Sequence, residues 1–217
     1  MRFILIGRGA ESHDRQRFIM REMAAQRKTE AEEWVPVSTE PTKHWCRKMR
    51  THFVASIGKK GYITKEEVME RARVALEHYP ELDADETLEQ ARQSWVQDLN
   101  CGMEPPPGYR LTEAQFVQNM WLVVNQPSYK QRVKEITAKV FEKLDKDKKG
   151  YVTKDNYLRM TKQLNNEETV TKIFEALDES NSGKIDREAI ERMYTFFFTD
   201  TEDEQHPFNF LRGPLLD

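Results

Sequence analysis

Two stretches of twelve residues, 145–156 and 178–189, place oxygen-bearing groups at intervals that suit a divalent cation. Calcium loops of this length take ligands at positions 1, 3, 5 and 9, a main-chain carbonyl at position 7 and a bidentate glutamate at position 12. In the second stretch, the oxygen donors at these positions are Asp178, Ser180, Ser182, Lys184 (through its carbonyl) and Asp186. In the first they are Asp145, Asp147, Tyr151 (through its carbonyl) and Asn156. Both stretches therefore indicate calcium chelation.

The segments around each stretch are patterned as helices. Phenylalanine and leucine close the segment before each loop, and glycine stands at position 6, where the chain must turn sharply. This is the helix, loop and helix of the EF-hand. The aliphatic residues at position 8, Val152 and Ile185, are predicted to pair as a short antiparallel bridge that joins the two loops.

Position 12 departs from the pattern in both loops, because Asn156 and Ala189 replace the glutamate. The first of these loops also carries Lys149 at position 5, and its lysines outnumber its aspartates, which disfavours a divalent cation. The loop at 178–189 keeps an acidic balance and is the better of the two. We expect calcium affinity of roughly millimolar or weaker, below the range of calcium sensors.

Residues 56–67 repeat the loop in a degraded form. Ile63 stands at position 8 and Glu67 at position 12, but serine, glycine and lysine replace the chelating residues at positions 1, 3 and 5. Thr64 and Glu67 have the spacing of a capping box, in which each side chain bonds the other residue's main-chain N–H at a helix start. This explains the glutamate without a metal, and we prefer it to a retained calcium ligand.

A fourth copy, about 104–115, contains three consecutive prolines, which cannot wrap a ligating loop in the usual way. Leu111 is predicted to pair with Ile63, and Thr112 with Gln115 forms a second capping box. This copy is therefore predicted to be structural.

Two local features are predicted for the later helices. One apolar face is expected to consist of Val133, Ile136, Val140, Phe141 and Leu144. Asn165 and Glu168 are expected to cap the helix that precedes the last loop.

The fold class predicted from these repeats is all-α, with two lobes of paired EF-hands whose loops are joined by short β-bridges. An N-terminal extension, 1–40, would contain one extra helix between Asp14 and Trp34. The N-terminal lobe spans 41–126, the C-terminal lobe 127–199, and an apolar tail 200–217 is expected to fold back on the body. A detachable latch is the alternative for that tail.

The composition of the chain excludes several classes of protein. The net charge of −3 shows no basic excess for nucleic acid, and no run of eighteen apolar residues predicts a membrane span. The N-terminus lacks the features of a targeting peptide, so a cytoplasmic monomer is expected. Cys46 and Cys101 fit no metal or redox spacing and are expected to be reduced.

The chain from about Trp45 onward resembles the invertebrate sarcoplasmic calcium-binding proteins, the coelenterate luciferin-binding proteins and the calexcitins. The resemblance rests on the eroded second loop at 107–112, the paired loops after it and the tail with its Gly-Pro-Leu ending. It implies a compact calcium buffer. The luciferin-binding relatives also enclose an apolar small molecule between their lobes.

Three functions therefore compete: a weak calcium-binding protein, a calcium-independent carrier of an apolar small molecule, and an adaptor for a partner helix. For the carrier, the expected cavity walls are aromatic and methionine side chains, which suit such ligands. They are Trp45, Met49, Trp95, Phe116, Met120, Trp121, Tyr194 and Phe197. The alternative is that these side chains simply form the core.

An enzyme is not expected. The chain has no phosphate-binding loop and no nucleophile-elbow motif. The histidines show no pair at i and i+4 for a metal and are expected on the surface or on helix faces. They are His13, His44, His52, His78 and His206.

Overall fold

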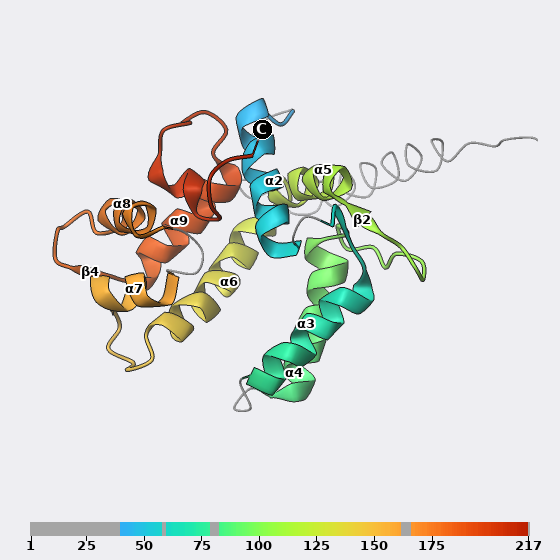
Figure 1. Cartoon of the computed structure of the whole chain (residues 1–217), viewed down its shortest axis with the longest axis horizontal. Helices are drawn as coiled ribbons and strands as arrows, with labels where there is room; N and C mark the ends of the chain where they lie inside the picture. Colours follow the sequence, from blue (N-terminus) through green and yellow to red (C-terminus); the bar gives the residue numbers. More distant parts are fainter. Residues whose placement is uncertain (1–39, 58–59, 79–82, 162–165, 217) are drawn as a thin grey trace, which may run out of the picture. The chain divides into compact units, whose positions relative to one another are not determined.

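The computed structural model describes residues 40–57, 60–78, 83–161 and 166–216, all of which belong to one compact unit (Figure 1). The helix expected between Asp14 and Trp34 lies outside the described residues. The described helices are α2 (Lys43–Ile57), α3 (Lys65–His78), α4 (Ala84–Gln93), α5 (Glu113–Val124), α6 (Tyr129–Leu144), α7 (Lys154–Thr161), α8 (Glu167–Leu177) and α9 (Arg187–Thr199). A π-helical turn (Ser94–Asp98) continues α4, and a 3₁₀ turn (Pro207–Phe210) lies in the tail. The predicted all-α class is confirmed.

The strands are two residues long and join the loops in pairs. Strand β1 (Tyr62–Ile63) pairs with β2 (Leu111–Thr112), and β3 (Val152–Thr153) pairs with β4 (Lys184–Ile185). Both pairs are antiparallel, with Ile63 opposite Leu111 and Val152 opposite Ile185. The two predicted bridges are confirmed in partner and register.

Capping boxes start two of the helices that leave these bridges. The Thr64 N–H donates to Glu67 Oε2 at 3.1 Å, and the Glu67 N–H donates to Thr64 Oγ1 at 3.4 Å. The Thr112 N–H donates to Gln115 Oε1 at 3.0 Å, and the Gln115 N–H donates to Thr112 Oγ1 at 3.4 Å. Each box satisfies two N–H groups that a helix start otherwise leaves unpaired.

The expected cap at Asn165 is wrong by one residue. Asn166 is the extended residue before α8, and its side chain accepts from the Thr169 N–H at 2.9 Å. Because α8 therefore begins at Glu167, Glu168 falls at the second helical position, too early for the predicted capping box.

The apolar face expected on α6 also needs correction, because Ile136 is 43% exposed. The buried face runs through Val133, Thr137, Phe141 and Leu144. Thr137 is fully buried. Its hydroxyl tolerates burial because it donates a hydrogen bond to the Val133 carbonyl of the same helix at 2.8 Å. Ile136 lies about 100° away around the helix and faces outward.

The helices pack as two groups that share α2. Helix α6 lies along α9, α7 lies against α8, and α3 pairs with α4 (Figure 1). Helix α2 packs on α5 within the N-terminal lobe and also touches α9 of the C-terminal lobe. No helix among the described residues is both long and apolar enough to cross a membrane.

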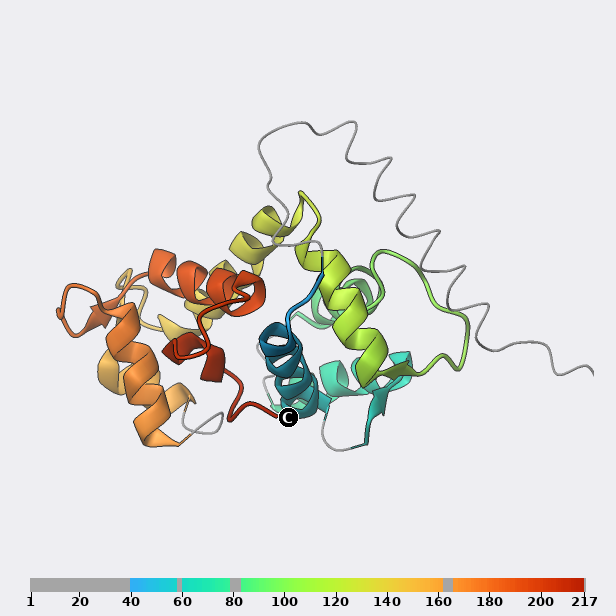
Figure 2. The same cartoon turned by 90° about the horizontal axis from the view of Figure 1, so that it is seen from above.

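Thr42, just before α2, and side chains of α2 itself donate hydrogen bonds to main-chain carbonyls at the end of α9 and in the tail. Thr42 Oγ1 donates to the Thr201 carbonyl at 2.9 Å, and Trp45 Nε1 donates to the Phe198 carbonyl at 2.6 Å. Nearer the end of the chain, Arg47 Nε donates to the Leu216 carbonyl at 3.2 Å. The last residues run beside α2 in Figure 2. The tail thus folds back and ties the two lobes together.

Lys48 is the most unusual member of this contact, because its side chain is fully buried. Its ammonium donates to the Asp200 carbonyl at 2.7 Å and lies 4.0 Å from the Asp200 carboxylate. It also lies 5.5 Å from the centre of the Phe196 ring and 5.9 Å from that of Phe197. Burial lowers the pKa of Lys48 to about 8, although Asp200 and Asp203 oppose this shift.

Replacing Lys48 by Met tests this buried charge. Because the folded-state pKa lies below the unfolded value of about 10.4, the unfolded chain binds more protons between these pH values. The wild type should therefore gain about 1–2 kcal/mol of unfolding free energy between pH 7.5 and 9.5 relative to Lys48→Met. Urea unfolding of both proteins at several pH values measures this gain. Parallel pH profiles would contradict it.

Candidate functional site

The loop at 178–189 is closed by hydrogen bonds among its own expected ligands. Asp178 Oδ1 accepts from Ser180 Oγ at 3.2 Å and from Ser182 Oγ at 3.0 Å. Asp178 Oδ2 accepts from the Gly183 N–H at 2.6 Å. The Lys184 carbonyl accepts from Ser182 Oγ at 3.2 Å. The expected calcium ligands do lie in one loop, but they satisfy one another.

The Asp178 carboxylate stays ionised in this loop. Burial raises its pKa, but hydrogen bonds from Ser182, Gly183 and Ser180 outweigh burial, and the net shift is downward. The last expected ligand, Asp186, caps α9 by accepting from the Ala189 N–H at 2.8 Å. The charge of Asp178 is thus stabilised by donors of the chain itself.

The loop at 145–156 carries its own cation. Lys149 Nζ lies 2.9 Å from Asp147 Oδ2, and this pairing lowers the pKa of Asp147. Asp145 accepts from the N–H groups of Lys149 at 2.9 Å and of Gly150 at 2.7 Å. An ammonium group at position 5 therefore neutralises the carboxylate at position 3.

Position 12 supplies no bidentate carboxylate in either loop. Asn156 Oδ1 accepts from Arg159 at 3.0 Å, and Ala189 is buried at the start of α9. The Tyr151 ring lies under Lys184, whose ammonium is 4.3 Å from the ring centre, so another cation stands beside these paired loops. The residues present fit a calcium ion poorly.

The loop at 56–67 has committed the acidic side chain at its position 12. Both oxygens of Glu67 are engaged, one by the Thr64 N–H and the other by the Lys60 ammonium. Within the described residues, no group of three or more His, Cys, Asp or Glu side chains is arranged to hold a metal ion.

Two of the expected cavity walls, Phe116 and Phe197, lie next to His52 of α2. Its ring centre lies 5.8 Å from that of Phe116 on α5, and 6.0 and 5.5 Å from those of Phe197 and Phe198 on α9. Tyr194 adjoins this group through Phe198, with ring centres 6.4 Å apart. Aromatic side chains of both lobes therefore surround one imidazole.

The remaining expected walls are buried. Trp45 meets Trp121 edge to face with ring centres 4.8 Å apart, and its indole N–H is engaged by the Phe198 carbonyl. Met49 is fully buried and Met120 is 7% exposed. These side chains belong to the same hydrophobic core as Phe116 and Phe197.

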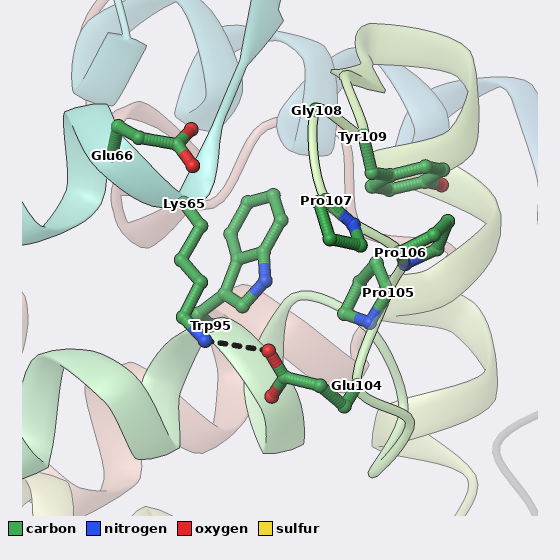
Figure 3. A pocket seen from close by; sticks show the side chains of 9 residues that line it. All are labelled: Lys65, Glu66, Trp95, Glu104, Pro105, Pro106, Pro107, Gly108 and Tyr109. Carbon is green, nitrogen blue, oxygen red and sulfur yellow. Dashed lines mark hydrogen bonds and ion pairs between the residues drawn. The ribbon is translucent and has the colours of Figure 1, made fainter.

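Trp95 is the exception among the expected walls. It belongs to the N-terminal lobe, where its ring centre lies 6.3 Å from that of Tyr109. It lines a separate open pocket of about 320 Å³, formed with Lys65, Glu66 and the turn 104–109 (Figure 3). The Lys65–Glu104 ion pair crosses this pocket.

Two polar atoms in the region of His52 have no hydrogen-bond partner within the described structure. They are Nδ1 of His52 and Nε of Arg212, and both are inaccessible to solvent. Burial, and after it the charge of Arg212, lower the pKa of His52 to about 3, so the imidazole is neutral at pH 7. The charge of Arg212 also reaches Tyr157 on α7, whose pKa is raised chiefly by burial.

Such atoms are uncommon, because most buried polar groups in proteins are hydrogen-bonded. An apolar pocket with a few unsatisfied polar groups is typical of a small-molecule site. His52 and Arg212 were not predicted from the sequence, which placed the histidines on surfaces or helix faces. His44, also on α2, is buried at 3% exposure.

A signal for these residues does exist in α2. His44, Lys48 and His52 recur every four residues, next to the apolar residues at 45, 49 and 53. A polar stripe beside an apolar one reads as the solvent face of an amphipathic helix. Lys48 of this stripe is buried because the end of α9 and the tail lie over it, which no local pattern reveals.

The chain was compared with known protein families, proteins and structures. No protein-family model and no curated protein matches the chain. Okadaic acid binding protein 2.1 is 41% identical, with a TM-score of 0.75 over 83% of this chain and 100% of that one. ApoAequorin in complex with (S)-HM-daCTZ has a TM-score of 0.62 at 14% identity, covering 85% of this chain and all of its own. The amphioxus sarcoplasmic calcium-binding protein has 0.54 at 13%, covering 82% and 100%.

The fold and the paired loops define an EF-hand protein of the type shared by sarcoplasmic calcium-binding proteins and photoproteins. Within that class the chain belongs to the same family as okadaic acid binding protein 2.1, to judge by identity over that protein's full length. The resemblance expected from the sequence is confirmed. The more distant structures confirm the fold alone.

Restoring the missing carboxylate tests what the loop at 178–189 lacks. Ala189→Glu supplies two oxygens at position 12 and should shift calcium affinity from roughly millimolar toward the micromolar range of sensors. Isothermal titration of wild type and variant measures both values. Glu188→Ala, next to it on α9, serves as the control and should bind like the wild type. Micromolar binding by the wild type would refute this reading of the loops.

Proposed function

We propose that this protein is a carrier that encloses an apolar small molecule between its lobes. The observation that carries the proposal is the pair of unpartnered atoms, His52 Nδ1 and Arg212 Nε, in a region walled by aromatic rings of α5 and α9. A bound molecule with matching polar groups would form hydrogen bonds with both atoms. It would thereby remove the free-energy cost of leaving them unpaired. The family relative that is named for okadaic acid supports the same class of function.

The carrier needs no calcium to stay closed. Thr42, just before α2, and three side chains of α2 donate to main-chain carbonyls of α9 and the tail. Thr51 Oγ1 accepts from the Leu216 N–H at 2.9 Å. These bonds join the lobes directly, whereas in EF-hand sensors the ion controls the angle between helices. A permanently closed scaffold suits retention of a ligand.

Residual calcium binding is a second proposed property, and it belongs to the loop at 178–189. That loop keeps an ionised Asp178 and no internal ammonium of the kind that Lys149 supplies to the other loop. We propose an affinity of roughly millimolar there, too weak to control ligand binding.

Okadaic acid, the ligand named for the relative, is the probe for the carrier function. Isothermal titration should give one site per chain. The affinity should be the same in EGTA and in about 1 mM calcium chloride, a concentration above the dissociation constants of calcium sensors. Phe198→Ala removes a ring that touches His52, Tyr194 and Phe197 and should weaken binding about tenfold or more. Ile136→Ala, at an exposed position of α6, should change nothing.

Two results would count against this function. One is the absence of okadaic acid binding together with the absence of any small molecule in the extracted native protein. The other is binding that Phe198→Ala leaves intact, since the site would then lie elsewhere.

A further inference from the structure

The N-terminal lobe contains the separate pocket of about 320 Å³ that Trp95 lines. Small-molecule pockets span about 300–1,000 Å³, so this one suits a compact ligand. It lies between the start of α3, the π-helical turn after α4 and the turn 104–109 (Figure 3). None of the described residues that line it belongs to α2, α9 or the tail. A ligand here would therefore bind independently of the proposed carrier site.

The π-helical turn fixes the Trp95 side chain in this pocket. The Asn100 side-chain amide donates to the Trp95 carbonyl at 2.8 Å, and the Leu99 N–H donates to the Ser94 carbonyl at 3.0 Å. The Tyr109 ring packs against the indole from the other side of the lobe's loop, with ring centres 6.3 Å apart. Turns of this kind are rare and occur frequently at functional sites. The pocket thus has a rigid aromatic wall.

The indole N–H of Trp95 is a donor without an acceptor. Trp95 is 1% exposed, yet the hydrogen bonds within the described residues include its carbonyl and not its indole N–H. In Figure 3 the indole nitrogen lies on the side of the ring that faces the prolines at 105–107. A buried tryptophan N–H usually has a hydrogen-bond partner. An oxygen atom of a ligand in the pocket would supply one.

The charged side chains of the pocket leave it with a net negative charge. Lys65 is paired with Glu104, and its side chain passes the Trp95 ring to reach that carboxylate (Figure 3). Glu66 also lines the pocket and forms no ion pair within the described residues. Hydrogen bonds from its own N–H and from Thr64 lower the pKa of Glu66, so its carboxylate is ionised at pH 7. Of the three charged groups, Glu66 is the one without an opposite charge.

We propose that this pocket binds a compact organic cation that also carries an oxygen acceptor, the chemical class of choline. The ammonium group would lie near the Glu66 and Glu104 carboxylates, and the oxygen would accept from the Trp95 N–H. The methyl groups would pack on the aromatic and proline rings, since aromatic walls are a common means of recognising quaternary ammonium groups. This second site goes beyond the carrier function and does not rest on it.

The Lys65–Glu104 pair already places an alkylammonium group of the chain in this pocket. Its side chains are 38% and 50% exposed, and exposed ion pairs contribute little to stability. A ligand cation can therefore replace the Lys65 ammonium beside Glu104 at small cost. An anion fits less well, because it would meet the Glu66 carboxylate and compete with Glu104 for Lys65. A neutral ligand would leave Glu66 without a cation.

The test compares choline with two ligands of the same shape on the full-length protein. In the neutral alcohol carbon replaces the charged nitrogen, and in propyltrimethylammonium a methyl group replaces the hydroxyl. Ligand-observed NMR measures affinity, and the indole N–H signal of Trp95 locates the ligand in the wild type. Choline should bind about 2- to 30-fold more tightly than the neutral alcohol. It should bind about 2- to 10-fold more tightly than propyltrimethylammonium.

Three variants assign these preferences to residues. Glu66→Gln keeps the size of the side chain and removes its charge, so it should reduce the preference for choline over the neutral alcohol. Trp95→Phe keeps an aromatic ring and removes the N–H, so it should abolish the preference over propyltrimethylammonium. Glu70→Gln, at an exposed position of α3 outside the pocket, should keep both preferences.

Several results would overturn the cation site. They are the absence of choline binding, equal affinity for choline and the neutral alcohol, and a charge preference that survives Glu66→Gln. Choline binding that leaves the Trp95 indole signal unmoved would also overturn it. The comparison of ligands uses the unaltered protein, so it holds even where a variant folds poorly. Okadaic acid tests the carrier function separately, and its binding should be the same in Glu66→Gln as in the wild type.

Discussion

The structure depends on the hydrogen bonds that α2 donates across to α9 and the tail. The Trp45 indole and the Lys48 ammonium reach carbonyls that the end of α9 leaves without partners inside the helix. A helix end buried without such donors would be destabilising, so α2 completes α9 as well as touching it. Because α2 belongs to one lobe and α9 to the other, the same bonds fix the lobes relative to each other.

Donors of the chain also satisfy the acidic side chains of the loops. Lys149 neutralises Asp147, and two serine hydroxyls turn toward Asp178. The turns retain their shape because the glycine at position 6 keeps a positive φ, +79° at Gly150 and +73° at Gly183, and because the β-bridges hold them in pairs. The turns therefore keep the EF-hand shape with Asn156 and Ala189 at position 12.

Much of the fold could be predicted because EF-hands encode it locally. A glycine and an aliphatic residue at fixed spacing sufficed to predict that Val152 opposes Ile185, and two capping boxes were read from four residues each. The cap at Asn166 was misplaced by one residue because adjacent asparagines offer the same chemistry. The candidate site was harder to predict, since His52 and Arg212 lie far apart in the chain and only the fold brings the charge of Arg212 near enough to act on His52. The polarity of His52 also favoured its assignment to a surface or a helix face.

The most direct test of a scaffold closed by its own donors is hydrogen exchange at the Trp45 indole, followed by NMR. This N–H bonds the Phe198 carbonyl and thus reports on the contact between the lobes. Trp45→Phe identifies its resonance. The account predicts slow exchange in EGTA that calcium leaves unchanged. Rapid exchange in EGTA that becomes slow on adding calcium would contradict it, because an ion would then be holding the lobes together.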